Sequence, residues 1–178
     1  MLLAAGADVK YRSSACDGQS DNCSALDVAV STGEFPSARL LVEAGADLSP
    51  PSFSEGKAND LSPLLKVAAS SSGPSELFEL MLEKGANPNY ASTKCSGQDF
   101  NYAALQWTLH AARIRVLCEW GADVNAVSRT DSRRTPLHVA AARRTASSAP
   151  VSALVVAGAD PFEVDAEGYA VTPNSSES

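Results

Sequence analysis

Leu80-Met81-Leu82-Glu83-Lys84-Gly85-Ala86-Asn87 is one of five related stretches in a chain of 178 residues. In each of the five, apolar residues precede a glycine, and Ala-Asp or Ala-Asn follows it. The glycines are Gly6, Gly45, Gly85, Gly121 and Gly158, which stand 39, 40, 36 and 37 residues apart. Five copies at this spacing indicate an internal repeat, and the repeat decides the fold class.

Each copy has a physical interpretation. The apolar residues predict the buried face of a short helix. The glycine suits the position just past the helix end, where the backbone becomes left-handed and glycine adopts that conformation at least cost. The Asp or Asn two residues later suits the turn that follows. Each copy therefore predicts a helix that stops at its glycine and leads into a turn.

A second element precedes the later copies. Its clearest form is Thr135-Pro136-Leu137-His138-Val139-Ala140-Ala141, and related stretches begin at Ser24, Ser62 and Ala103. Ser or Thr suits a helix N-cap, and Pro suits the first helical position. Ala103 lacks the hydroxyl, so Asn101 is an alternative N-cap one turn earlier. Each unit is thus predicted to be a helix, a turn, a second helix, a glycine stop and an extended loop.

These two motifs together resemble the ankyrin repeat family. The resemblance rests on Thr135, Pro136, Leu137 and His138 and on Gly121-Ala122-Asp123-Val124-Asn125, and it covers roughly residues 1–169. It implies an all-α solenoid of stacked antiparallel helix pairs with projecting hairpin-like loops. No unit can bury its apolar face alone, so stacking would supply the core. Every spacing exceeds the family period of about 33 residues.

The repeat divides the chain into an array over 1–169 and a tail, 170–178, that we expect to be disordered. The expected bounds are a partial unit at 1–23, units of about 24–61, 62–100, 101–134 and 135–164, and the start of a further unit at 165–169.

The overall composition excludes several classes of protein. The net charge of -7 argues against a chain that binds nucleic acid or an anionic membrane as a whole. No apolar run approaches the roughly 20 residues needed to cross a bilayer. The first eight residues lack the basic start and the length of a signal peptide. We therefore expect no nucleic-acid partner, no membrane association, and a cytoplasmic or nuclear location.

Four cysteines, Cys16, Cys23, Cys95 and Cys118, show no zinc-ligand spacing with either histidine. Two interpretations are open. All four are reduced thiols of an intracellular protein, which is the favoured hypothesis, or Cys16 and Cys23 form a disulfide in a secreted one.

No catalytic signature occurs in the sequence, so we predict no enzyme activity, no catalytic residue, no cofactor and no metal site. His138 could be considered for catalysis, but the family resemblance implies a structural role in which it hydrogen-bonds Thr135. His110 has no nucleophile or acid at triad spacing. It is expected near the end of a first helix, where its positive charge would be favourable.

Residues 113–144 hold seven arginines and three acids, a local balance of +4 in an acidic chain. This segment is either a solvated face or a site for an acidic partner segment, since arginine binds carboxylates in a bidentate manner. Arg129, Arg133 and Arg134 are expected at a loop tip. Near them in sequence, Phe100, Tyr102 and Trp107 are either packed between units or exposed as binding hot spots.

The resemblance implies a protein–protein interaction module that binds a partner through loop tips and the concave face of the first helices. The partner is expected to be another protein with an acidic segment, and the chain is expected to be a monomer. An alternative is the targeting or regulatory arm of a larger multidomain enzyme or signalling protein. A structural spacer is a third hypothesis.

Overall fold

The computed structural model describes residues 6–13, 23–49, 62–70, 72–92, 103–108, 110–128, 132–143 and 147–171. These residues contain eight α-helices and one two-stranded sheet. The elements in chain order are β1 (Arg12–Ser13), β2 (Cys23–Ser24), α1 (Ala25–Thr32), α2 (Phe35–Glu43), α3 (Pro63–Ala69), α4 (Ser75–Glu83), α5 (Ala104–Trp107), α6 (Ala111–Glu119), α7 (Pro136–Ala142) and α8 (Ala149–Val156). The described chain is therefore mostly helical, as predicted.

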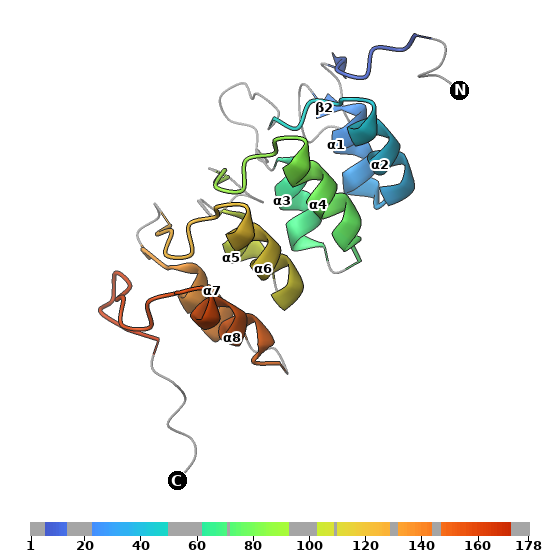
Figure 1. Cartoon of the computed structure of the whole chain (residues 1–178). Helices are drawn as coiled ribbons and strands as arrows, with labels where there is room; N and C mark the ends of the chain where they lie inside the picture. The colour runs from blue at the N-terminus through green and yellow to red at the C-terminus, as the bar shows by residue number, and fades with distance from the viewer. Residues whose placement is uncertain are drawn as a thin grey trace.

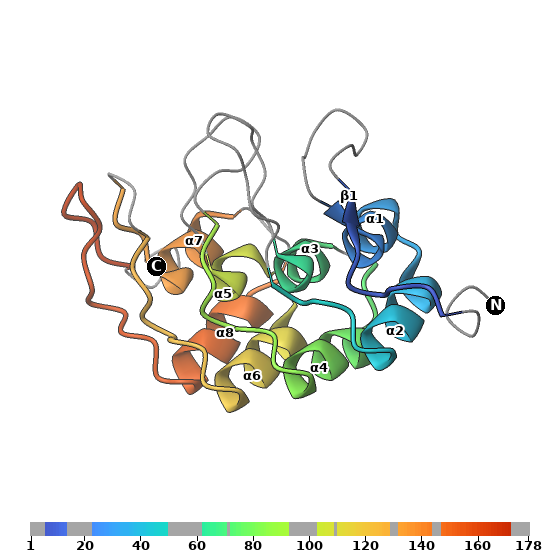
Figure 2. The ribbon, with the colours of Figure 1, turned by 90° about the horizontal axis from the view of Figure 1, so that it is seen from above.

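The helices form four consecutive pairs that follow one another along the molecule (Figure 1). Within each pair the two helices pack together, and each also packs on the corresponding helix of the next pair. The first helices, α1, α3, α5 and α7, form one row, and the second helices, α2, α4, α6 and α8, form the other (Figure 2). Contacts are thus local along the stack, between neighbours.

One apolar core runs between the two rows. In α4, the side chains of Leu77, Phe78, Met81 and Leu82 are almost fully buried, whereas Glu76, Glu79 and Glu83 are exposed. This spacing places the apolar side chains on one face of the helix. Other large, fully buried members of the core are Leu26, Leu64, Leu65, Ile114, Leu117, Leu137 and Leu154.

Three of the four first helices begin at the expected hydroxyl. The Ser24 Oγ accepts a hydrogen bond from the Asp27 N–H (3.1 Å), and the Asp27 carboxylate accepts one from the Ser24 N–H (2.9 Å). The Ser62 Oγ accepts from the Leu65 N–H (3.3 Å). Thr135 caps α7 in the same way. These bonds satisfy N–H groups that a helix leaves without intrahelical partners.

The fourth first helix, α5, starts differently from the alternative based on Asn101. Its N-cap is Ala103, and the helix begins at Ala104. The Gln106 Oε1 accepts a hydrogen bond from the Ala103 N–H at 2.7 Å. Gln106 therefore supplies the side-chain half of a capping box, so this helix start does not require a hydroxyl at residue 103.

The glycine stops have the predicted geometry. Gly85 has a φ of 94°, its N–H donates to the Leu82 carbonyl (2.9 Å), and the Ala86 N–H donates to the Met81 carbonyl (2.9 Å). This pair of bonds is a Schellman motif. The other second helices end in the same way at Gly45, Gly121 and Gly158, and Gly6 also has a positive φ. The glycine repeat in the sequence thus corresponds to the same helix termination, made again in each unit.

A short antiparallel ribbon was not predicted. Arg12 pairs with Ser24 and Ser13 pairs with Cys23, which joins β1 to β2 at the start of α1. Cys23 is disulfide-bonded, whereas Cys118 is a free thiol. The favoured expectation of four reduced cysteines is therefore wrong for Cys23. Cys16 and Cys95 lie outside the described residues.

The described chain ends in a second hairpin-like segment. Val164 and Ala170 form an isolated antiparallel bridge, and Val171 packs against the core. Ala170 and Val171, the first two residues of the expected tail, thus belong to this hairpin-like segment. Residues 172–178 lie outside the description.

Replacing Gly85 tests the helix stop. A Cβ at this position would meet no atom within 4 Å, so the cost of Gly85→Ala comes from the left-handed backbone alone. We expect a loss of about 1 kcal/mol in the free energy of unfolding, measured by urea titration. Gly85→Asn, the control, should cost less because asparagine tolerates this conformation. Equal stability of Gly85→Ala and the wild type would contradict the assignment.

Candidate functional site

The loops that leave the second helices share one side-chain-to-backbone turn. Asp47 Oδ1 accepts a hydrogen bond from the N–H of Ser49, two residues later, at 2.9 Å. The same bond runs from Lys10 to Asp8, from Asn89 to Asn87, from Asn125 to Asp123 and from Phe162 to Asp160. The predicted role of the Asp or Asn after the glycine is thereby confirmed. The turn fixes the direction of every loop.

Two asparagines then join neighbouring loops. The Asn89 amide donates to the Gly121 carbonyl (2.9 Å) and accepts from the Asp123 N–H (2.8 Å). Asn125 makes the same two bonds to the next loop, with the Gly158 carbonyl (3.4 Å) and the Asp160 N–H (2.9 Å). Asn89 and Asn125 each lie two residues after the Asp or Asn that forms the turn, and we call this position of a loop the ladder position. The residue pattern within one loop does not reveal this link between units, because each bond joins residues more than 30 positions apart.

The first helices hold the loops from the other side. The Gln106 Nε2 donates to the carbonyls of Ala126 (3.2 Å) and Arg134 (3.1 Å). The His138 Nε2 lies 2.9 Å from the Tyr169 carbonyl, which can only accept, so this nitrogen carries the proton. Gln106 and His138 thus occupy equivalent places and fix successive loops.

His138 is structural, as the resemblance implied. Its Nδ1 lies 2.8 Å from the Thr135 Oγ1. The Thr135 N–H also donates to Nδ1 (3.4 Å), so Nδ1 is the accepting nitrogen of the ring and the Thr135 hydroxyl donates to it. Both ring nitrogens are used, and the side chain is buried. The imidazole is therefore committed to holding helix α7 against the loop that follows it.

The last two loops lie side by side. The Ala166 N–H donates to the Ser132 carbonyl at 3.1 Å, and Figure 2 shows the two segments running together at one end of the molecule. They carry exposed side chains of kinds that are common in binding hot spots, namely Arg133, Phe162 (83% exposed) and Tyr169 (66% exposed). Val127 and Val164 are also exposed there. We call these five residues the loop edge.

The partner-binding residues predicted from the sequence coincide only in part with the loop edge. Phe100, Tyr102 and Arg129 lie outside the described residues. Arg133 is exposed, with a φ of 45°, and Arg134 is half-buried. The sequence analysis did not select Phe162 and Tyr169. The exposure of a side chain depends on which other segments pack against it, and no local sequence pattern reveals that.

Trp107 is partly buried and packs against the core at the end of α5. Its position agrees with the packing interpretation rather than with an exposed hot spot.

Two arginines of the basic segment donate hydrogen bonds to backbone carbonyls of the preceding helix pair. Arg113 of α6 is buried and donates to the Val67 (3.0 Å), Ser70 (2.6 Å) and Gly73 carbonyls around the end of α3. Burial lowers the pKa of its guanidinium. Arg143 donates to the carbonyls of Gln106 (3.1 Å) and Trp107 (3.0 Å) at the end of α5. Each therefore caps a first helix of the preceding pair.

His110 lies at the start of a helix, not near the end of one as expected. It is the N-cap of α6. Desolvation and the nearby Arg113 charge lower the pKa of its imidazole. A cation is disfavoured at the positive end of a helix dipole, so the charge-based argument for this residue does not hold.

A buried carboxylate links the first two pairs. Asp27, which is 2% exposed, lies 3.3 Å from the Arg12 guanidinium and 3.4 Å from the Lys66 ammonium. Arg12 also reaches Asp47 (3.1 Å) and the Ser49 carbonyl (2.9 Å). A buried charge needs such partners, because an unpaired one is strongly destabilising. This cluster takes the place that Gln106 and His138 fill in later units.

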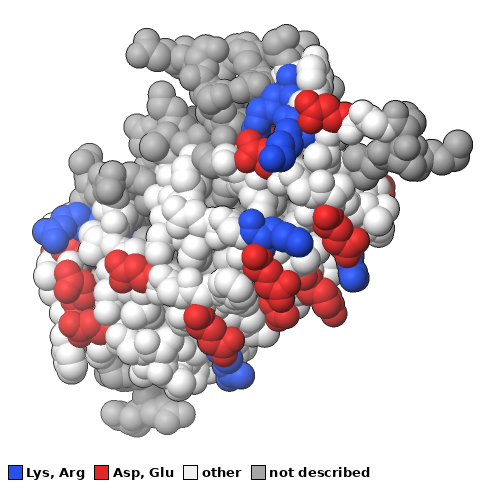
Figure 3. Space-filling model, turned by 45° about the horizontal axis from the view of Figure 1, so that its top comes forward, with Lys and Arg blue, Asp and Glu red and all other residues white. Residues whose placement is uncertain are grey.

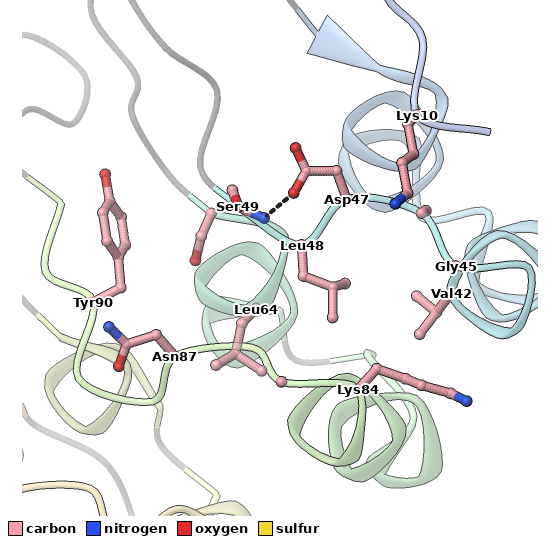
Figure 4. Close-up of a pocket in the computed structure, with 13 residues that line it drawn as sticks. Lys10, Val42, Gly45, Asp47, Leu48, Ser49, Leu64, Lys84, Asn87 and Tyr90 are labelled. Carbon is pink, nitrogen blue, oxygen red and sulfur yellow. Dashed lines mark hydrogen bonds between the residues drawn. The ribbon is translucent and has the colours of Figure 1, made fainter. Parts of the chain in front are cut away.

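A surface pocket of about 710 Å³ lies between the loops that follow α2 and α4. We call it the junction pocket. Its walls are the segments 45–49 and 84–90, with Lys10 at the rim, and Val42, Leu48 and Leu64 supply apolar side chains (Figure 4). It lies at a junction where serine, not asparagine, holds the ladder position.

Charge is distributed over the face in Figure 3 without one large basic patch, and acidic and basic side chains alternate across it. Within the described ranges, no three His, Cys, Asp or Glu side chains are grouped so that they could hold a metal ion. None of the described helices has both the length and the apolar character needed to cross a membrane.

Comparison with known proteins adds no family assignment. No protein-family model matches the sequence, and no curated protein matches it significantly.

Replacing Arg113 tests its capping role. Arg113→Met keeps the aliphatic contacts but leaves the carbonyls at the end of α3 without their donor, and we expect a loss of about 3 kcal/mol in the free energy of unfolding. Arg115→Met, an exposed position on the same helix, should change it by less than about 0.5 kcal/mol. Urea titration of both variants provides the measurement. Similar losses in the free energy of unfolding for the two variants would contradict the capping role.

Acid should weaken the turn at Asp165. Hydrogen bonds from the Tyr169 and Glu167 N–H groups, opposed by desolvation, lower the pKa of this carboxylate. The folded pKa of Asp165 thus lies below its unfolded value of about 3.9. Such a carboxylate stabilises the folded state fully above about pH 3.9, and this stabilisation is lost as the pH falls through the folded pKa. Wild type should therefore exceed Asp165→Asn in thermal midpoint at pH 7, and the difference should shrink at pH 3. A difference that does not depend on pH would contradict this.

Proposed function

We propose that the chain is an ankyrin-type repeat array that binds another protein and catalyses no reaction. The stacked helix pairs, the repeated Schellman stops and the Thr135–His138 hydrogen bond support the family. Each is a physical feature that the resemblance implies, and together they span the described chain from Gly45 to Tyr169.

The loop edge is the binding surface in this proposal. The observation that carries it is the fixed pairing of two loops that expose aromatic and arginine side chains. The Gln106 and His138 bonds and the bond between Ala166 and Ser132 hold these loops before any partner arrives. A surface ordered in advance loses less conformational entropy on binding.

The exposed apolar side chains would lose contact with water on binding. Phe162 and Tyr169 are among the most exposed large side chains of the described residues. Aromatic residues and arginine contribute most to protein interfaces when they enter pockets on a partner. An acidic group on that partner is the natural match for Arg133. A cytoplasmic or nuclear location and a monomeric state stay predictions.

A pull-down with quantitative mass spectrometry tests the surface. The tagged chain, a Phe162→Ala/Tyr169→Ala variant and a Leu40→Ala control would be exposed to one lysate. Leu40 is 61% exposed on α2, so the control also loses an exposed apolar side chain but on another element. We expect at least one protein that the wild type and the control retain and that the double variant retains at least tenfold less.

Two outcomes would contradict the proposal. If neither the wild type nor the control retained a protein above a tag-only sample, the binding function would fail. If every retained protein also bound the double variant equally, the loop edge would be the wrong surface.

A further inference from the structure

The ladder position differs between the two halves of the stack. It holds Asn89 and Asn125 toward the C-terminal end, and each joins its loop to the next one. Ser49 holds it at the junction pocket. The pattern of loop-to-loop bonds thus breaks where the pocket lies.

The groups that an asparagine would bind are present at this junction. By analogy with Gly121 and Asp123, they are the Gly85 carbonyl and the Asn87 N–H, and both residues line the pocket. The described residues supply neither of these two atoms with a hydrogen bond of the kind that Asn89 provides. Ser49 does not replace it, because its N–H donates to the Asp47 carboxylate (2.9 Å) and its short side chain carries no carboxamide to reach the next loop.

The surroundings indicate the rest of the ligand. Val42, Leu48 and Leu64 form an apolar part of the lining, and Lys10 and Lys84 lie at the rim (Figure 4). Neither lysine forms an ion pair with another described residue, and Asp47, the acid in the lining, is already paired with Arg12. The pocket therefore combines two amide-matching backbone groups, an apolar surface and two lysines that take no part in the ion pairs of the described residues.

We propose that the junction pocket binds the carboxamide side chain of an acidic segment of a partner protein, an inference that rests on the proposed protein-binding function. The carboxamide oxygen accepts from the Asn87 N–H, and its amino group donates to the Gly85 carbonyl. These are the two bonds that Asn89 and Asn125 make within the chain. Carboxylates beside the carboxamide face Lys10 and Lys84, and an apolar neighbour contacts Leu48 and Leu64.

A nuclear magnetic resonance titration of the full chain tests the site with two peptides. The probes are acetyl-Glu-Asn-Leu-Glu-N-methylamide and acetyl-Glu-Ala-Leu-Glu-N-methylamide, in which only the asparagine side chain of the first supplies a primary carboxamide. We expect the first to bind at least tenfold more tightly and to shift the amide signal of Asn87. Equal affinities, or shifts that map away from residues 45–49 and 84–90, would overturn the proposal.

Ser49 provides matched variants. Ser49→Asn should fill the site from within and abolish the preference for the asparagine peptide, whereas Ser49→Ala leaves the site open and should keep it. Ser49 is exposed, so both variants should remain folded, which the spectra themselves report. Retained preference in Ser49→Asn would overturn the proposal. A Lys10→Ala/Lys84→Ala variant should bind at least threefold more weakly, and unchanged binding would overturn the acidic part.

The two proposals fail separately. If neither peptide binds while the Phe162→Ala/Tyr169→Ala variant still loses a partner, only the junction pocket is wrong. If the chain retains no protein from any lysate, the protein-binding function itself is wrong, whatever the peptides do.

Discussion

Packing between neighbouring helix pairs is the constraint on which the rest of this structure depends, because no pair covers its own apolar surface. Val42 of α2 and Leu82 of α4 are almost fully buried, whereas Val155, at the same position in the last helix pair, is 50% exposed. A stack of this kind gains its stability from nearest-neighbour contacts. Polar side chains must therefore also act between neighbours if they are to fix the register of the stack.

The polar links between pairs serve that purpose. Arg113 and Arg143 reach back to cap α3 and α5, whose ends have carbonyls that a short helix leaves without partners. Asn89 and Asn125 tie successive loops, and Gln106 and His138 hold those loops against the first helices. Polar side chains that the sequence alone would place on the surface thus order the helix ends and the loops. Our proposal takes this ordering of the loop edge as its preparation for a partner.

Local features of the fold could be predicted from the sequence, and contacts between distant residues could not. The glycine stops, the turn after them and the Thr135 cap depend on a few adjacent residues. The roles of Arg113 and Asn89 depend on partners more than 30 residues away, so spacing along one helix or loop does not reveal them. The candidate site was predicted only in part, because the exposure of Phe162 and Tyr169 is set by what packs around them. His110 was misplaced because α5 is shorter than its counterparts.

Native-state hydrogen exchange of the full chain tests the neighbour-dependent stack most directly. In this account, amides of α4, which has helix pairs on both sides, exchange more slowly than those of α8, whose Val155 and Val156 are exposed. Protection should therefore decrease from α4 toward α8. Protection in α8 equal to or greater than that in α4 would contradict a structure held together by nearest-neighbour packing.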